Sequence, residues 1–396
     1  MLKRKQALLL GVLLSSALPV CRAQAAEAVF DDAVLHDIRL SVHPSDWQQL
    51  KDTFFENTYY PAEFTWRGIT VEEVAIRSRG GGSRSGFKPG LRIDFNRFVK
   101  GQHFLGLTSL VLDNHWQDPS FLRERLSLLL FRRMGIPAPR TAYARLYVNG
   151  SYGGLYSIVE EVNKVFLKDR FGQNDGHLYE YKWLSEYHFE FLGEDPEAYA
   201  PMFKAQTHES QPEYERLVAM IKTINEAPDE DFAERMRQYL DLELLIRHLA
   251  VENYVGEYDG LLGDWGMNNF YLYRFEKSDR FQFIPWDKDV TFYQPEHSVL
   301  FNLTANRLTS RLFASPAWRD LYLREIEKCA AEAGGESGWL AAELERAVRL
   351  TRAAALEDPN KRQSNDEYGQ WVEYTRKWVG YRNSQVLSQV FTLRQN

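Results

Sequence analysis

Residues 263–292 read GDWGMNNFYLYRFEKSDRFQFIPWDKDVTF, two strand-like runs with polar residues at both ends. The runs Phe270–Arg274 and Arg280–Pro285 are separated by a short polar link, which predicts a β-hairpin. A hairpin brings its two ends together, so polar side chains before and after it are expected to meet. These side chains are Asp264, Asn269, Asp287 and Asp289. Carboxylate and amide oxygens gathered in this way suit a hard divalent cation.

The spacing of these residues is typical of a phosphotransfer site. Protein kinases use an aspartate as base, a nearby asparagine as a metal ligand, and a metal-binding aspartate after a hairpin. Asp264, Asn269 and Asp287 follow that order and the same first interval. The sequence differs from kinases in lacking His-Arg before Asp264 and in having Trp286-Asp287-Lys288 in place of Asp-Phe-Gly. The alternative is a solvated turn followed by a strand that ends in capping carboxylates.

The first 25 residues have the pattern of a secretory signal peptide. A basic start, Met1–Lys5, is followed by the apolar run Ala7–Val20 and by Ala23-Gln24-Ala25, which predicts cleavage after Ala25. The apolar run is too short to favour a membrane-spanning helix, and no later segment is long and apolar enough to cross. We therefore expect an exported protein, located in the periplasm, the cell envelope or the medium.

Composition excludes some partners. The formal net charge is −7 and no long Lys/Arg tract is present, so nucleic acid is not an expected partner. Aromatic residues make up 14% of the chain, a content compatible with a packed core or with sugar-binding platforms. The length predicts two or three domains.

The first part of the chain predicts mainly strands around one helix. Arg77–Lys88 is rich in glycine and cationic residues, which suits either a loop close to phosphate oxygens or a flexible hairpin tip. The helix is expected over 118–134, and Asn149-Gly150 predicts a hairpin turn. The expected strands cover 35–42, 64–66, 71–76, 91–95, 142–148 and 154–159. The order of these elements is that of the N-lobe of a kinase: a glycine-rich loop, a Lys-bearing strand, a helix, two strands and a link.

The remainder predicts mainly helices. The charged segment 204–231 is interpreted as a lid or an insertion. Helices are expected over 241–254, 317–333, 339–356 and 366–391. The predicted fold class is α+β, with a β-rich lobe over 26–160 and a mainly helical lobe over 161–396 that carries the hairpin 264–289.

These residues together resemble the CotH kinase family, named for spore coat protein H. The resemblance covers roughly residues 75–293. It rests on Arg77-x-Arg-Gly80 with Lys88, Asp118-x-Ser-x-x-Arg123, Gly135-Ile-Pro, Tyr147-Val-Asn-Gly-x-Tyr152-x-Gly-x-Tyr156 with Glu160, Asp169-Arg-Phe, the Asp264 turn, Asn269-x-Tyr-Leu-Tyr and Ile284-Pro-Trp-Asp-x-Asp289.

The resemblance implies an atypical, two-lobed protein kinase fold and assigns roles to individual residues. Asp264 would act as catalytic base, and Asn269 and Asp287 would bind Mg²⁺ or Mn²⁺. Asp289 would be a further metal or supporting residue. Residues expected to contact ATP are Arg79, Lys88, Glu124 as a carboxylate partner for Lys88, and Glu160 at the lobe link.

The implied activity is transfer of the γ-phosphate of ATP to Ser or Thr of secreted or envelope proteins. Such a transfer requires positioning and charge neutralisation, which a metal and cationic side chains supply. One alternative is a non-catalytic coat or adhesion protein of the same fold. A second alternative is a carbohydrate-active enzyme that uses paired carboxylates and exposed tryptophans.

Overall fold

The structure is a computed structural model in which residues 26–395 are described. The expected signal peptide, residues 1–25, lies outside the described residues. The chain contains both helices and strands, so the predicted α+β class is confirmed. Between residues 26 and 395, no helix combines the length and apolarity required to span a bilayer.

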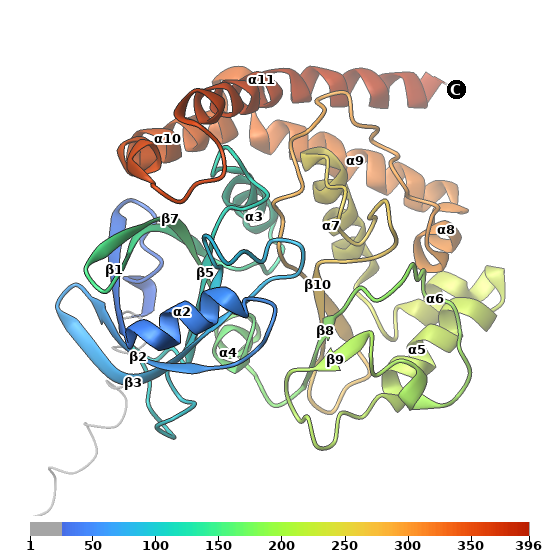
Figure 1. Ribbon diagram of the computed structural model, residues 1–396. Coiled ribbons are helices and arrows are strands. Elements are labelled where there is room, and N and C mark those ends of the chain that lie inside the picture. Colours follow the sequence, from blue (N-terminus) through green and yellow to red (C-terminus); the bar gives the residue numbers. More distant parts are fainter. Residues whose placement is uncertain (1–25, 396) are drawn as a thin grey trace, which may run out of the picture.

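The first part of the chain forms a closed seven-stranded barrel, drawn in blue to green in Figure 1. Its strands are β1 (Leu35–Val42), β2 (Tyr60–Trp66), β3 (Ile69–Ser78), β4 (Leu91–Asp94), β5 (Ser109–Asp113), β6 (Thr141–Val148) and β7 (Ser151–Val159). They are ordered β1-β2-β3-β4-β5-β7-β6, and a parallel pairing of β1 with β6 closes the ring. Buried and exposed positions alternate along β1, so Ile38 and Leu40 fill the interior.

A second, four-stranded sheet carries the predicted hairpin. Its order is β11-β10-β8-β9, with β8 (His177–Tyr181), β9 (Phe203–Ala205), β10 (Phe270–Arg274) and β11 (Phe281–Pro285). The pairing of Phe270 with Pro285 and of Arg274 with Phe281 confirms the hairpin and brings its two ends together. The strands β8 and β9 were not predicted, because they lie in a stretch whose charges suggested helices.

Helices pack around both sheets. They are α2 (Pro44–Asp52), α3 (Arg123–Arg133), α4 (Lys164–Phe171), α5 (Glu215–Glu226), α6 (Phe232–Met236), α7 (Leu242–Val255), α8 (Arg307–Phe313), α9 (Pro316–Ala333), α10 (Trp339–Glu357) and α11 (Asn365–Gln395). In Figure 1, α9, α10 and α11 run across the top, and α3 lies between them and the barrel. A large apolar cluster runs through α3, α7 and the C-terminal helices. A smaller cluster, which includes Val111, Tyr271 and Trp286, joins the barrel to the four-stranded sheet.

Two predicted elements differ from the structure. The helix expected from residue 118 begins at Arg123, because the Asp118 carboxylate accepts hydrogen bonds from the backbone N–H groups of Ser120 and Arg123 and forms a turn. The segment 204–231 is not a detached lid. Its helix α5 buries an apolar face, including Leu217 and Ile221, in the main core, while its charges face solvent.

Candidate functional site

A cavity of about 690 Å³ lies between the barrel and the four-stranded sheet. The barrel side is lined by Arg79 and by the glycine-rich loop 80–84. The sheet side is lined by Tyr271 of β10 and by Asp287 and Asp289, which follow β11. Residues distant in sequence therefore meet at one hollow, which includes both ends of the predicted hairpin.

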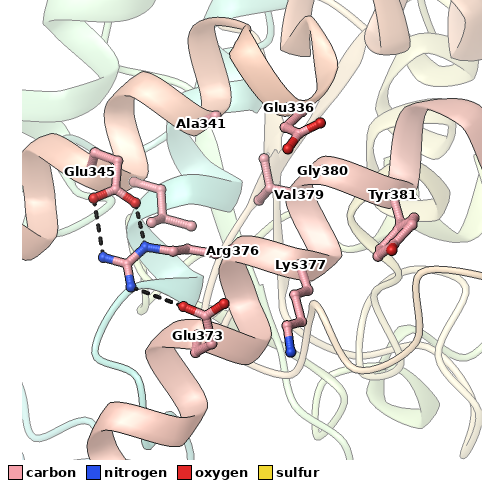
Figure 2. A pocket seen from close by; sticks show the side chains of 10 residues that line it. Glu336, Ala341, Glu345, Glu373, Arg376, Lys377, Val379, Gly380 and Tyr381 are labelled. Atoms are coloured by element: carbon pink, nitrogen blue, oxygen red, sulfur yellow. Dashed lines mark hydrogen bonds and ion pairs between the residues drawn. The ribbon is translucent and has the colours of Figure 1, made fainter.

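A second hollow, of about 410 Å³, lies between α10 and α11 and is shown in Figure 2. Its Arg376 is paired with Glu345 and Glu373. None of the predicted site residues lines it. The candidate site is therefore the cavity beside the barrel, which several of the predicted site residues line.

Arg79 is the cation at the centre of a group of acids. It follows β3, and its guanidinium lies 3.5 Å from the Asp113 carboxylate and 3.9 Å from that of Asp287. Burial by itself would lower the pKa of Arg79, but Asp287, Asp113 and Glu124 together raise it. Its planar group also lies over the Trp286 ring, with 5.6 Å between the guanidinium carbon and the ring centroid. Arg79 is therefore held firmly in its charged form.

The acids outnumber this cation. Burial raises the pKa of Asp287 to about 6, and repulsion from Asp113 and Asp259 adds to the effect, whereas Arg79 and Lys288 oppose it. Burial, followed by the charges of Asp287, Asp113 and Glu124, raises the pKa of Asp289 well above its ordinary range.

The same group of acids acts on the helix carboxylate Glu124. Burial and the charges of Asp113 and Asp287 raise the pKa of Glu124 well above its ordinary range. Its Oε2 is buried and has no hydrogen-bond partner among the described residues. Such an arrangement favours the binding of an additional cation.

Asp259 is joined to the end of the hairpin by two amide groups. Its Oδ1 accepts a hydrogen bond from the Asn268 side-chain nitrogen at 3.0 Å, and its Oδ2 accepts one from that of Asn269, also at 3.0 Å. All three residues line the cavity. Because each amide directs its nitrogen to Asp259, its oxygen faces away from Asp259 and is free to act as a cation ligand. Burial raises the pKa of Asp259, and the hydrogen bond from Asn268 opposes that shift.

The structure does not bring Asp264 into this group. Asp264 is exposed and does not line the cavity, and its backbone N–H donates to the Tyr258 carbonyl. The spacing between Asp264 and Asn269 pointed to Asp264 on the assumption that the chain between them folds as it does in protein kinases. Here the turn 263–266 carries Asp264 outward, and Asp259 occupies the place beside Asn269.

Lys88 also lies apart from the cavity. It is in the loop before β4, rather than on a strand, and its Nζ donates to Asp358 at 2.7 Å and to the Leu155 carbonyl at 2.8 Å. Asp358 follows α10, so this fully buried pair ties the barrel to the C-terminal helices. The carboxylate partner expected for Lys88, Glu124, lies beside Arg79 instead.

Glu160 is placed in a separate ion-pair group. Its carboxylate pairs with Arg140 at 2.5 Å and with Arg170 at 2.8 Å, and it does not line the cavity. Its neighbour Glu161 does line the cavity and pairs with Arg92 of β4 at 2.7 Å.

The donor set fits Mg²⁺ or Mn²⁺ bound together with a phosphate group. No three His, Cys, Asp or Glu side chains of residues 26–395 are arranged to hold a metal ion by themselves. Mg²⁺ is usually held by one or two carboxylates, with substrate phosphates and water completing its shell. Asp287, Asp289 and the Asn269 oxygen provide that smaller set, and Arg79 lies beside Asp287 to meet the phosphate.

Comparison with known protein families matches residues 76–386 to the family described as CotH kinase protein. The chain belongs to the CotH family. The resemblance based on residues 75–293 is thereby confirmed, and the match extends through α9 and α10 into α11.

Two proteins of Bacillus subtilis (strain 168) are similar to this chain. The inner spore coat protein H is 26% identical over 300 residues, which cover 73% of this chain and 80% of the relative. The inner spore coat protein H-like protein is 26% identical over 221 residues, which cover 55% of this chain and 60% of the relative. Their names describe a place in the spore coat, and the family description names a kinase.

Two acids, Asp259 at the cavity and Asp113 beside Arg79, were missed by sequence reasoning. Asp259 stands in an Asp-Gly pair in the loop that follows the buried helix α7, a position typical of a loop that presents a side chain. Asp113 ends β5, a strand that was itself not predicted. The Asp-Gly pair was a usable signal, whereas nothing in the sequence around Asp113 distinguished it from a strand end.

Proposed function

We propose that this CotH-family protein is an atypical, two-lobed kinase that transfers the γ-phosphate of ATP to Ser or Thr of a protein, with Mg²⁺ or Mn²⁺ as cofactor. The observation that carries the proposal is the joining of Arg79, Asp259, Asn269 and Asp287 at one cavity. A cation, a hydrogen-bonded carboxylate and oxygen ligands are the parts that phosphoryl transfer requires. The family description supports the same activity.

Each residue has a role in this proposal. Asp287 and the Asn269 oxygen hold the metal, with Asp289 behind them, and Arg79 binds the phosphate oxygens. The metal, when bound, neutralises the phosphate charge and orients the group for in-line attack. Asp113 pairs with Arg79 at 3.5 Å and helps to fix its position, and the charge of Glu124 contributes to raising the Arg79 pKa.

Asp259 accepts the proton of the acceptor hydroxyl or orients that hydroxyl. Its two hydrogen bonds from Asn268 and Asn269 fix the carboxylate beside the metal ligands. This role belongs to Asp259 in place of Asp264, because only Asp259 lies at the cavity.

The rim of the cavity suits a protein acceptor. Trp183 lines the cavity yet is 48% exposed, and its ring nitrogen donates to the backbone carbonyl of Trp265, whose side chain is 62% exposed. Large aromatic side chains exposed together are enriched at protein interfaces. Because the sequence predicts a signal peptide, we expect the acceptor to be an exported protein.

Incubation of the purified protein with γ-labelled ATP, Mg²⁺ or Mn²⁺ and dephosphorylated casein as a general acceptor tests the proposal. We expect label on Ser or Thr, on casein or on the protein itself, and none when EDTA is present. Nucleotide binding with no transfer to any acceptor would instead favour the binding-protein alternative. Absence of both binding and transfer would contradict the proposal.

A further inference from the structure

Lys288 lies between two residues of the cavity but faces the interior. Asp287 and Asp289 line the cavity, whereas the Lys288 side chain is fully buried. Its Nζ donates to Glu252 Oε1 at 2.8 Å and lies 3.8 Å from Glu257 Oε2. A buried ammonium group beside two buried acids is costly to desolvate, which suggests that Lys288 has a specific role.

The two acids that bind Lys288 also hold the loop that carries Asp259. Glu252, on α7, accepts hydrogen bonds from the backbone N–H groups of Leu261 at 3.1 Å and Leu262 at 3.2 Å. Glu257 accepts one from the backbone N–H of Asp259 itself, at 2.8 Å. The backbone on both sides of Gly260 is therefore hydrogen-bonded to the same two carboxylates.

Gly260 shows how close this approach is. A methyl group added at residue 260 would come within 2.5 Å of Glu252 Oε1 and 2.7 Å of Glu257 Cγ. Its carbonyl also accepts the backbone N–H of Asn268 at 2.9 Å, which links the loop to the asparagines beside Asp259. The loop passes directly against the acids and has no space to move toward them.

The segment that carries Lys288, residues 286–291, is also hydrogen-bonded to the surrounding fold. The Lys288 carbonyl accepts a hydrogen bond from the Thr291 hydroxyl at 3.2 Å, and that hydroxyl lies 3.1 Å from the Ser127 hydroxyl of α3. The Trp286 N–H donates to the Asn269 carbonyl at 3.1 Å. Lys288 thus joins two segments, 257–262 and 286–291, that are each attached to the surrounding fold.

We propose that Lys288 is a positioning residue that sets the distance between Asp259 and the metal-binding residues Asp287 and Asp289. The Lys288 ammonium donates to Glu252 and lies 3.8 Å from Glu257, and these acids hold the Asp259 loop by its backbone. The proposal rests on the proposed function for its effect on transfer. A misplacement of about 1 Å between catalytic groups can reduce a rate by about 100-fold, because alignment of the reacting groups is lost.

Lys288→Met tests the proposal by removing the ammonium while keeping much of the side-chain volume. In the folded variant we expect kcat for transfer to fall by about 100-fold, while the KM for ATP changes by less than about 5-fold, since Arg79 and Asp287 remain. The double variant Lys288→Met with Glu252→Gln removes a second charge and keeps one acceptor oxygen, so one of the Leu261 and Leu262 amides keeps its hydrogen bond. It guards against a single variant that fails to fold, and we expect the same loss of kcat.

Two further variants separate positioning from general stability. Arg247→Met removes another ion pair of α7, with Glu325 of α9, and should lower the midpoint of thermal unfolding while leaving kcat within about 2-fold, because Arg247 does not line the cavity. Gly260→Ala displaces the loop without changing any charge and should reproduce the fall in kcat. If Lys288→Met and the double variant, once folded, keep kcat within 3-fold of the wild type, the proposal is overturned.

Hydrogen exchange followed by mass spectrometry gives a readout that does not depend on transfer. Loss of Lys288 should increase exchange in peptides covering 257–262, with no change in the barrel strands. If the wild-type protein transfers no phosphate, the proposed function fails, and this exchange result alone decides the positioning role. Unchanged exchange over 257–262 in the lysine variants would then overturn it.

Discussion

The aspartate that accepts or orients the acceptor hydroxyl is the residue on which sequence and structure differ most. The structure favours Asp259, and the kinase interval favours Asp264. We predict that Asp259→Asn reduces transfer by about 100- to 10,000-fold, the usual contribution of a positioned acid–base group. We predict that Asp264→Asn, at an exposed position outside the cavity, leaves transfer within about 3-fold of the wild type.

The structure also indicates how much Asp259→Asn should lower the free energy of unfolding. Asp259 accepts one hydrogen bond on each oxygen, from Asn268 and Asn269, whereas an asparagine at residue 259 has only one accepting oxygen. One of these bonds is lost, and a hydrogen bond to a charged group contributes about 1.5–3 kcal/mol. The variant should therefore remain folded but show a lower free energy of unfolding.

The assay compares initial rates of phosphate transfer from labelled ATP, with nucleotide affinity measured in parallel by calorimetry. Asp259→Asn should keep nucleotide affinity within about 10-fold while transfer falls. The reasoning would be refuted if Asp264→Asn abolished transfer and Asp259→Asn did not. It would also be refuted if neither substitution changed the rate.

Three further predictions concern other parts of the structure. Arg79→Met should weaken nucleotide binding by about 10- to 100-fold in calorimetry, because one charge-assisted contact is lost; unchanged affinity would exclude Arg79 as a phosphate ligand. Lys88→Met should lower the free energy of unfolding in urea by about 3–5 kcal/mol by leaving Asp358 buried and unpaired, and a nucleotide affinity reduced more than about 3-fold would show a binding role instead. His297 is buried near Arg382, and burial first and that charge second lower its pKa to about 3. His297 binds a proton at higher pH in the unfolded protein than in the folded one, so the free energy of unfolding should fall by about 2 kcal/mol between about pH 6.5 and pH 5. His297→Gln should remove this part of the pH dependence in urea unfolding. An unchanged pH dependence would contradict the assignment.

Local sequence patterns predicted much of the fold. Alternation predicted β1, the Asn149-Gly150 turn predicted the β6–β7 hairpin, and the runs flanking the 276–279 link predicted β10 and β11. These signals depend on near neighbours in the chain. The closure of the barrel by β1 and β6 depends on a parallel pairing across more than a hundred residues, for which no local pattern exists.

The candidate site was predicted in part for the same reason. Arg79, Asn269, Asp287 and Asp289 were expected at one place, and all four line the cavity. Lys88 and Glu160 have suitable chemistry, but their partners, Asp358 and Arg140, are brought to them only by tertiary packing. Counting residues could not decide between Asp259 and Asp264, because the direction of a turn depends on backbone conformation, and Asn269 and Asp287 both have a positive φ.

The central claim is that the cavity beside the barrel binds a metal–nucleotide complex. Thermal unfolding of the protein with ATP, with Mg²⁺ or Mn²⁺, and with both together tests it most directly. A ligand at about 100 times its Kd stabilises the folded state by about 2.7 kcal/mol, so nucleotide and metal together should raise the midpoint by several degrees, and Asp287→Ala should abolish the rise. No rise at millimolar concentrations, or an equal rise in the Asp287→Ala variant, would contradict the account.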